Sequence, residues 1–348
     1  MRELIDLMLN DMKSVDEFYK PTNFWDNGLI SILNDLKTDA DFKNFRSHKS
    51  ARYMYVPTYE HSLYKKHKGL INKIFKVNHA NKPIPSVEGF FGTLSGYNNS
   101  KSDYRVYLAT NKSSHPNVTN VSESLIGNPI EYYSFDNKNF SKPFLNYLLG
   151  INFLKNNFST DNVHNVFELG GGYGTLGEIL LKSSSDIFYL NIDIPPVAAV
   201  STYYLSEVFG KETVLTYDQS RNLEEINIEE IRKKYKCVVL CPWQLPKIKG
   251  SFELFVNFMS FQEMEPKIVK NYINYVEKLT TDFVLLRNSK FGKRIANEEN
   301  NVGVKEPTTT DMMYSMFEKF SLAGRDSTVY GQKGQKFDSE IACLSRNK

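Results

Sequence analysis

The sequence has little cysteine and no long apolar run, and both absences exclude whole classes of protein. Its 348 residues contain three cysteines, Cys237, Cys241 and Cys343, which are too few for a disulfide framework. No His pair accompanies Cys237 and Cys241, so we interpret the cysteines as core residues rather than zinc ligands. No segment approaches the ~18 apolar residues of a membrane span, and the first residues lack the pattern of a signal peptide. We therefore expect a cytoplasmic protein without a membrane partner.

An excess of charge of one sign is also missing. The chain has 43 basic and 40 acidic residues, interleaved along the sequence, and a formal net charge of +3. A nucleic-acid-binding protein usually carries a basic stripe or block, so we expect no nucleic-acid partner. The composition is that of a globular protein, long enough for one large domain or two modest ones.

From about residue 141 onward, short apolar segments alternate with helical patterns. We predict strands at residues 166–169, 187–193, 238–241, 254–257 and 283–286, and helices at 142–157, 175–182, 197–209 and 267–279. Such alternation is typical of an α/β fold whose parallel sheet is covered by helices on both faces. A helix at 312–320 and a strand at 341–344, joined by a polar loop, predict a terminal antiparallel hairpin. We divide the chain into a helical and irregular region, 1–130, and an α/β domain, 131–348.

A glycine-rich turn follows the first predicted strand and reads Glu168-Leu-Gly-Gly-Gly-Tyr-Gly-Thr-Leu-Gly177. Glycines at a strand-to-helix turn let the backbone approach a ligand closely. Residues 172–177 fit the dinucleotide spacing G-x-G-x-x-G. Residues 168–174 fit the acidic-x-G-x-G-x-G pattern of class I S-adenosylmethionine (SAM)-dependent methyltransferases. The carboxylate favours SAM, because a buried Glu168 needs a cation and SAM carries an ammonium group.

Asp193 lies 19 residues after Gly174, at the end of the second predicted strand. An acidic side chain at this place can accept hydrogen bonds from both ribose hydroxyls of a bound nucleotide. This feature is compatible with both SAM and NAD.

Three segments carry a resemblance to a known family: Glu168–Gly177, Asp193-Ile-Pro-Pro, and Leu254-Phe-Val-Asn-Phe-Met-Ser-Phe-Gln-Glu-Met264. Over about residues 130–290 the chain resembles the sugar O-methyltransferase family, a branch of the class I SAM-dependent methyltransferases. The short segments Asn23-Phe-Trp-Asp26 and Asn44-Phe-Arg46 are also similar. The resemblance implies a Rossmann-like seven-stranded sheet with a terminal antiparallel strand. It also implies methyl transfer from SAM to a sugar hydroxyl, with S-adenosylhomocysteine as product.

The resemblance also implies which residues contact SAM. The glycine loop and the second strand would contribute Glu168, Gly170, Gly172, Gly174, Asp193 and Ile194. The segment Pro242-Trp243-Gln244 would border the adenine, and Asn257 and Ser260 would flank the methionine part, although the inserted residues 213–235 weaken the adenine assignment. At the helix that precedes the glycine loop, we expect Ser141, just before its first residue, and Asn146 to meet the carboxylate of the cofactor.

For catalysis, the sequence offers carboxylates just after the fourth predicted strand. Methyl transfer to an alcohol needs alignment and a base that removes the hydroxyl proton. We predict Glu263 as that base, Glu265 as second candidate and Gln262 as the residue that orients the acceptor. The six histidines show no ligand-like spacing, so we expect no metal, although Glu263 and Glu265 leave a magnesium site open.

Two other functions stay open at this point. An NAD-dependent oxidoreductase would use Gly172, Gly174 and Gly177, and a non-catalytic protein would bind SAM without turnover. For the methyltransferase we expect a sugar or sugar nucleotide as substrate, and a homodimer remains open. Residues 1–130 would form a substrate lid or a dimer contact, with tyrosines that stack on sugar faces: Tyr53, Tyr55, Tyr59 and Tyr97.

Overall fold

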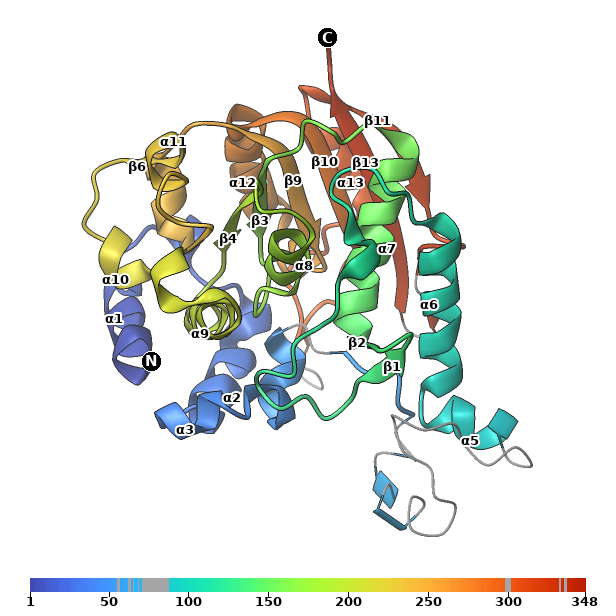
Figure 1. The fold of residues 1–348 in the computed structure, drawn as a ribbon. Helices are drawn as coiled ribbons and strands as arrows, with labels where there is room; N and C mark the ends of the chain where they lie inside the picture. Colours follow the sequence, from blue (N-terminus) through green and yellow to red (C-terminus); the bar gives the residue numbers. More distant parts are fainter. Residues whose placement is uncertain are drawn as a thin grey trace.

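The computed structural model describes residues 1–54, 57–61, 64, 66–67, 69–70, 88–297, 302–331, 333–334 and 337–348 (Figure 1). Tyr55 lies outside the described residues. Among those described, no helix has the length and apolarity needed to cross a membrane.

A central sheet runs through the molecule, with described strands β3 (Asn165–Leu169), β4 (Phe188–Ile192), β5 (Val214–Leu215), β7 (Cys237–Leu240), β9 (Phe252–Phe258), β10 (Thr280–Ser289), β11 (Phe320–Asp326), β12 (Lys333–Gly334) and β13 (Phe337–Arg346). The strand order is β11-β13-β10-β9-β3-β4-β7-β5, and β12 pairs with β13. Strands β5, β7, β4, β3, β9 and β10 are parallel, whereas β13 is antiparallel to both β10 and β11. The predicted α/β fold with a terminal antiparallel strand is therefore confirmed. The described sheet contains two short strands, β5 and β12, in addition to the seven strands that we expected.

Helices cover both faces of the sheet (Figure 1). On one face lie α7 (Lys142–Asn157), α8 (Thr175–Ser183) and α9 (Val197–Phe209), and on the other α12 (Pro266–Leu279) and α13 (Thr310–Met316). Each face has its own cluster of buried apolar side chains. Helix α7 is buried nearly all round, because α6 (Tyr97–Thr110) packs on its outer side.

The remaining elements are short: α1 (Arg2–Met12), α2 (Asp26–Asp35), α3 (Asp39–Phe42), α5 (Glu88–Leu94), α10 (Tyr217–Ser220), α11 (Ile228–Ile231), the antiparallel pair β1 (Tyr133–Phe135) and β2 (Lys138–Phe140), and the parallel pair β6 (Ile226–Asn227) and β8 (Ile248–Lys249). Ile5, Phe42 and Phe45 of the N-terminal region belong to the same buried cluster as α7, α8 and α9. The region thus shares a core with the sheet, and the division at residue 130 stays a prediction.

Arg46 anchors the N-terminal region to this core by a buried ion pair. Its guanidinium is fully buried, donates to the carboxylate of Glu123 and to the carbonyl of Ser124, and lies 5.1 Å from the ring centroid of Tyr173. Burial raises the pKa of Glu123, and the charge of Arg46 opposes that rise. Because Tyr173 belongs to the glycine loop, the ion pair lies directly beside the segment that the sequence marks for ligand binding.

Candidate functional site

A pocket of about 260 Å³ opens at the carboxyl ends of β3, β4 and β9. In open α/β sheets this edge is where ligands bind. The lining comes from the strand ends and the glycine loop (Leu169, Gly170, Gly172, Ile192, Asp193, Ile194, Phe258, Met259, Ser260), from the N-terminal region (Lys20, Pro21, Thr22, Phe24, Trp25, Arg52, Tyr53), and from later segments (Pro242, Glu263, Met264, Ile268, Tyr272, Lys293). Of the residues predicted from sequence, the pocket brings together those of the glycine loop and strand ends, together with Tyr53 and Pro242: Gly170, Gly172, Asp193, Ile194, Ser260 and Glu263.

The glycine loop depends on residues without side chains. Gly170 and Gly172 have φ angles of +74° and +59°, a region that L-residues rarely adopt. A Cβ atom on Gly170 would lie 2.2 Å from the hydroxyl oxygen of Ser260, so the loop and the end of β9 approach each other at this point. The loop backbone therefore borders the pocket, and it lies in close contact with the segment that follows β9.

We expect the substitution Gly170→Ala to lower the free energy of unfolding by about 1–2 kcal/mol from the left-handed backbone alone, with a further cost for the contact with Ser260. Urea denaturation measures the change. Gly89→Ala is the matched control, since a Cβ atom at Gly89 meets nothing within 4 Å. Equal stability of the two variants would contradict this view of the loop.

Asp193 joins the loop to the end of β4. One of its carboxylate oxygens accepts from the backbone N–H of Gly172 and the other from that of Ile194, both at 2.8 Å. Each oxygen keeps a lone pair for a ligand hydroxyl. Burial raises the pKa of Asp193 to about 8, although the two N–H groups oppose the rise.

Glu168, predicted to contact the cofactor, does not line the pocket. Its carboxylate is fully buried and accepts from the hydroxyls of Tyr147, at 2.7 Å, and of Tyr189. A Cβ atom on Gly171 would lie 2.6 Å from one of its oxygens, so the carboxylate of Glu168 packs directly against the glycine loop. Burial raises its pKa to about 7. Two tyrosine hydroxyls thus satisfy the group for which we expected a ligand cation.

The last two glycines of the motif pack α8 onto its neighbours. Gly174 has a φ angle of +101°, precedes the first residue of α8 and faces Leu205. A Cβ atom on Gly177 would lie 2.5 Å from the ring of Tyr189 on β4. Neither glycine lines the pocket, and both permit close contact between helix and sheet.

The segment predicted to border adenine contributes only Pro242 to the pocket. The side chain of Gln244 accepts from the backbone N–H of Cys241 and donates to the hydroxyl of Ser220. Trp243 donates its indole N–H to the hydroxyl of Tyr217 at 3.1 Å. These contacts stabilise the conformation of the loop after β7. Trp243 and Gln244 therefore contribute to the loop and do not line the pocket.

At the end of β9, Asn257 is buried and Ser260 lines the pocket. The amide of Asn257 donates to the carbonyl of Leu169 and accepts from the backbone N–H of Phe261, so it ties the ends of β3 and β9 together. Between them, Met259 has a φ angle of +65°, which is strained for a residue with a side chain. Such strain is concentrated at functional sites.

Of the three predicted catalytic residues, only Glu263 lines the pocket. Its carboxylate lies 3.1 Å from the ammonium of Lys293. Burial raises its pKa, opposed by Lys293 and by a hydrogen bond from Trp25. Gln262 is buried and accepts from the backbone N–H of Ser289. The carboxylate of Glu265 accepts from the backbone N–H of Lys305 at 3.0 Å, so the two glutamates do not share one site.

Ser141 and Asn146, predicted to meet the carboxylate of the cofactor, also lie outside the pocket. The hydroxyl of Ser141 donates to Glu123 and caps the first turn of α7. Asn146 is buried, and its backbone carbonyl accepts from Arg287. Both side chains are therefore buried in the protein interior and do not line the pocket.

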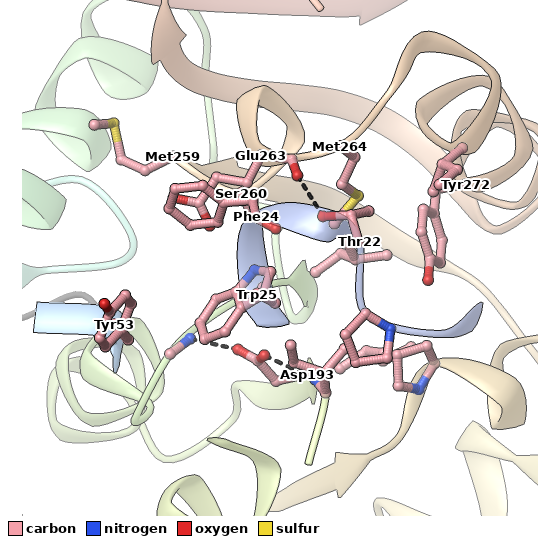
Figure 2. A pocket seen from close by; sticks show the side chains of 18 of the residues that line it. Thr22, Phe24, Trp25, Tyr53, Asp193, Met259, Ser260, Glu263, Met264 and Tyr272 are labelled. Carbon is pink, nitrogen blue, oxygen red and sulfur yellow. Dashed lines mark hydrogen bonds between the residues drawn. The ribbon is translucent and has the colours of Figure 1, made fainter. Parts of the chain in front are cut away.

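The N-terminal region forms one wall of the pocket, and most of the residues in this wall were not predicted from the sequence. The hydroxyl of Thr22 donates to the carbonyl of Glu263 at 2.7 Å, and the rings of Trp25 and Tyr53 lie 6.4 Å apart. In Figure 2, Trp25 projects between Asp193 on one side and Glu263 on the other. The short match at residues 23–26 and the tyrosine at 53 were the available signals. Tyr59 and Tyr97 instead pack against Tyr133.

Comparison with known proteins gives no family for the chain. No protein-family model matches it, and no curated protein matches it. Among solved structures it is similar to magnesium protoporphyrin IX methyltransferase from Synechocystis PCC 6803 with bound SAM (11% identity, 58% of this chain and 79% of that chain, TM-score 0.38). It is also similar to a SAM-dependent methyltransferase from Clostridium acetobutylicum ATCC 824 (7%, 58% and 91%, TM-score 0.39) and to the mitomycin 7-O-methyltransferase (11%, 59% and 58%, TM-score 0.37). These values describe a distant likeness.

Proposed function

We propose that the protein is a SAM-dependent O-methyltransferase that acts on a hydroxyl of a sugar or sugar nucleotide. The observation that carries the proposal is the meeting of the glycine loop and Asp193 at the pocket, where the N–H of Gly172 holds the carboxylate in place. This arrangement suits a ligand that has a ribose and a charged chain next to it. The family resemblance of the same segments supports SAM as that ligand.

The lining residues fit the parts of SAM. Asp193 would accept from the ribose hydroxyls, and the apolar side chains of Ile192, Ile194 and Pro242 would contact the adenine. Gly170 leaves the loop backbone accessible to the methionine part. When bound, SAM supplies a methyl group on a sulfonium, which is already an excellent leaving group.

The protein itself must align the acceptor and remove its proton. Glu263 is a largely buried carboxylate in the pocket lining, and burial raises its pKa above the ordinary value, so in its ionised form it is a stronger base than a solvated glutamate. The aromatic side chains of Phe24, Trp25 and Tyr53 would contact the faces of a sugar ring. Three cationic side chains in the lining, Lys20, Arg52 and Lys293, would attract the phosphates of a sugar nucleotide.

SAM affinity is expected to rise with pH up to about 8 in the native protein. Below that pH the carboxyl of Asp193 is mostly protonated, because burial raises its pKa to about 8. Ribose hydroxyls donate to the ionised form, so binding releases a proton and affinity increases by up to about tenfold per pH unit. Calorimetric titration across pH measures the slope. Asp193→Asn should bind weakly with no such slope, and an unchanged slope in this variant would assign the proton to another group.

Turnover is tested by incubating the protein with methyl-labelled SAM and a panel of nucleotide-linked sugars, followed by mass spectrometry. The proposal predicts label in one sugar and stoichiometric S-adenosylhomocysteine. Binding of SAM without transfer to any acceptor would favour the non-catalytic alternative.

One observation favours an NAD-dependent enzyme as second candidate. Gly177 allows α8 to contact the ring of Tyr189, which is the packing role of the third glycine in dinucleotide-binding folds. Helix packing of this kind does not itself contact a ligand, so we rank this candidate below the methyltransferase.

A further inference from the structure

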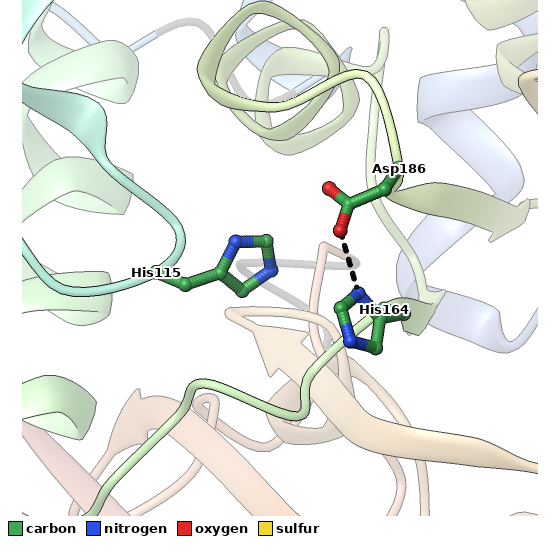
Figure 3. Close-up of side chains that lie close together, drawn as sticks. All are labelled: His115, His164 and Asp186. Carbon is green, nitrogen blue, oxygen red and sulfur yellow. Dashed lines mark ion pairs between the residues drawn. The ribbon is translucent and has the colours of Figure 1, made fainter.

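Three metal-ligating side chains meet at the end of the sheet opposite the pocket (Figure 3). His164 directly precedes β3, and Asp186 precedes β4 by two residues. Since β3 and β4 are parallel neighbours, their amino ends lie side by side. His115 reaches the same place from the loop that follows α6. The sequence spacing gave no hint of this cluster, because the sheet brings its members together.

The ligand atoms are close enough for one ion. One ligand atom from each of the three residues lies within 4.8 Å of the others, and Nδ1 of His164 is 3.0 Å from a carboxylate oxygen of Asp186. Zinc bonds of about 2.0–2.2 Å place tetrahedral ligand atoms roughly 3.4 Å apart. Rotation of half-exposed side chains covers the difference, and their exposure gives an ion access from solvent.

The surroundings also match those of metal ligands. Nε2 of His115 lies 2.7 Å from the carbonyl oxygen of Val163, which only an N–H can face. This contact leaves the lone pair of His115 on Nδ1. Metal-bound histidines typically donate their other ring N–H to a carbonyl or carboxylate in this way. The second oxygen of Asp186 accepts from the hydroxyl of Ser184, which orients the carboxylate.

We propose that His115, His164 and Asp186 bind one divalent transition-metal ion, with Zn²⁺ as the best match. Two imidazoles and one carboxylate form a ligand set that zinc accepts with water in the fourth position. Because the ligands come from three separate segments, the ion would link the loop that follows α6 to the starts of β3 and β4. The ion would take no direct part in chemistry at the pocket, which lies at the other end of both strands.

The test is calorimetric titration of Zn²⁺ into the full chain after EDTA treatment, with any histidine tag removed, at a slightly alkaline pH that keeps histidine neutral. We expect one Zn²⁺ per chain. His115→Ala and Asp186→Asn should each weaken binding at least about tenfold. The control is His67→Ala, which removes an exposed histidine outside the cluster and should bind as the native protein does.

Thermal unfolding supplies a second readout. Zn²⁺ that binds only the folded state raises the melting temperature of the native protein, and Asp186→Asn should remove this rise. Because Asp186 is about half exposed, the variant should fold normally without metal. Absence of zinc binding by the native protein, or equal binding by all variants, would overturn the proposal. SAM binding is a separate measurement at the other edge of the sheet and is expected to be the same in all of them.

Discussion

Replacement of Glu263 by glutamine is expected to lower turnover by about 10²–10⁴-fold while SAM affinity changes little. The amide keeps the size of the side chain but cannot accept the proton of the acceptor hydroxyl. Lys293, which is partly exposed, would then be solvated, so the fold should persist. Initial rates with the acceptor that the labelling panel identifies, and calorimetric titration with SAM, separate the two effects.

Glu265→Gln is the matched control for this experiment. The residue is two positions away, and its carboxylate binds the backbone N–H of Lys305 rather than lining the pocket. Turnover of this variant should stay near that of the native protein. If Glu265→Gln were the inactive variant and Glu263→Gln the active one, the placement of the base at the pocket would be wrong.

The second large effect concerns the buried ion pair that anchors the N-terminal region. Arg46→Met is expected to lower the free energy of unfolding by about 3–5 kcal/mol, because Glu123 then remains as a buried charge without its cation. Adding Glu123→Gln to this variant removes the uncompensated charge and should restore part of the stability. Urea denaturation of the native protein, the two single variants Arg46→Met and Glu123→Gln, and the double variant gives the three differences from the native protein.

An exposed pair provides the comparison. Lys233 and Glu230 are 2.7 Å apart, but about two thirds of each side chain is exposed. Lys233→Met should therefore leave stability nearly unchanged. If Arg46→Met had an equally small effect, the ion pair of Arg46 would not be the anchor that we describe.

The sheet could be predicted from sequence because its signals are local. Each parallel strand is a short apolar run bounded by glycine, proline or polar residues, and α9 was predicted with the bounds that the structure shows. The strand β10 is longer than predicted, since it continues through Arg287 and Asn288, both buried by partners from distant segments. The edge strand β5 has two residues, too few for any periodicity.

The site could be predicted only where one segment determines it. Gly170, Gly172 and Asp193 follow strands whose carboxyl ends must meet, so their place at the pocket follows from the fold. The placement of Glu168 outside the pocket could not be predicted, because its partners Tyr147 and Tyr189 lie on α7 and β4 and carry no mark of this contact in sequence. The cationic lining residues Lys20, Arg52 and Lys293 could not be predicted either, because they come from segments far apart in the sequence.

The most direct test of the central claim, that this pocket binds SAM, is calorimetric titration of the native protein and Asp193→Ala with SAM and with NAD. We predict one SAM site in the native protein and no heat from NAD. In Asp193→Ala, loss of a charged hydrogen bond, roughly 1.5–3 kcal/mol, should weaken SAM binding by about one to two decades. Binding of NAD in place of SAM, or equal SAM affinity in a folded Asp193→Ala protein, would contradict the account.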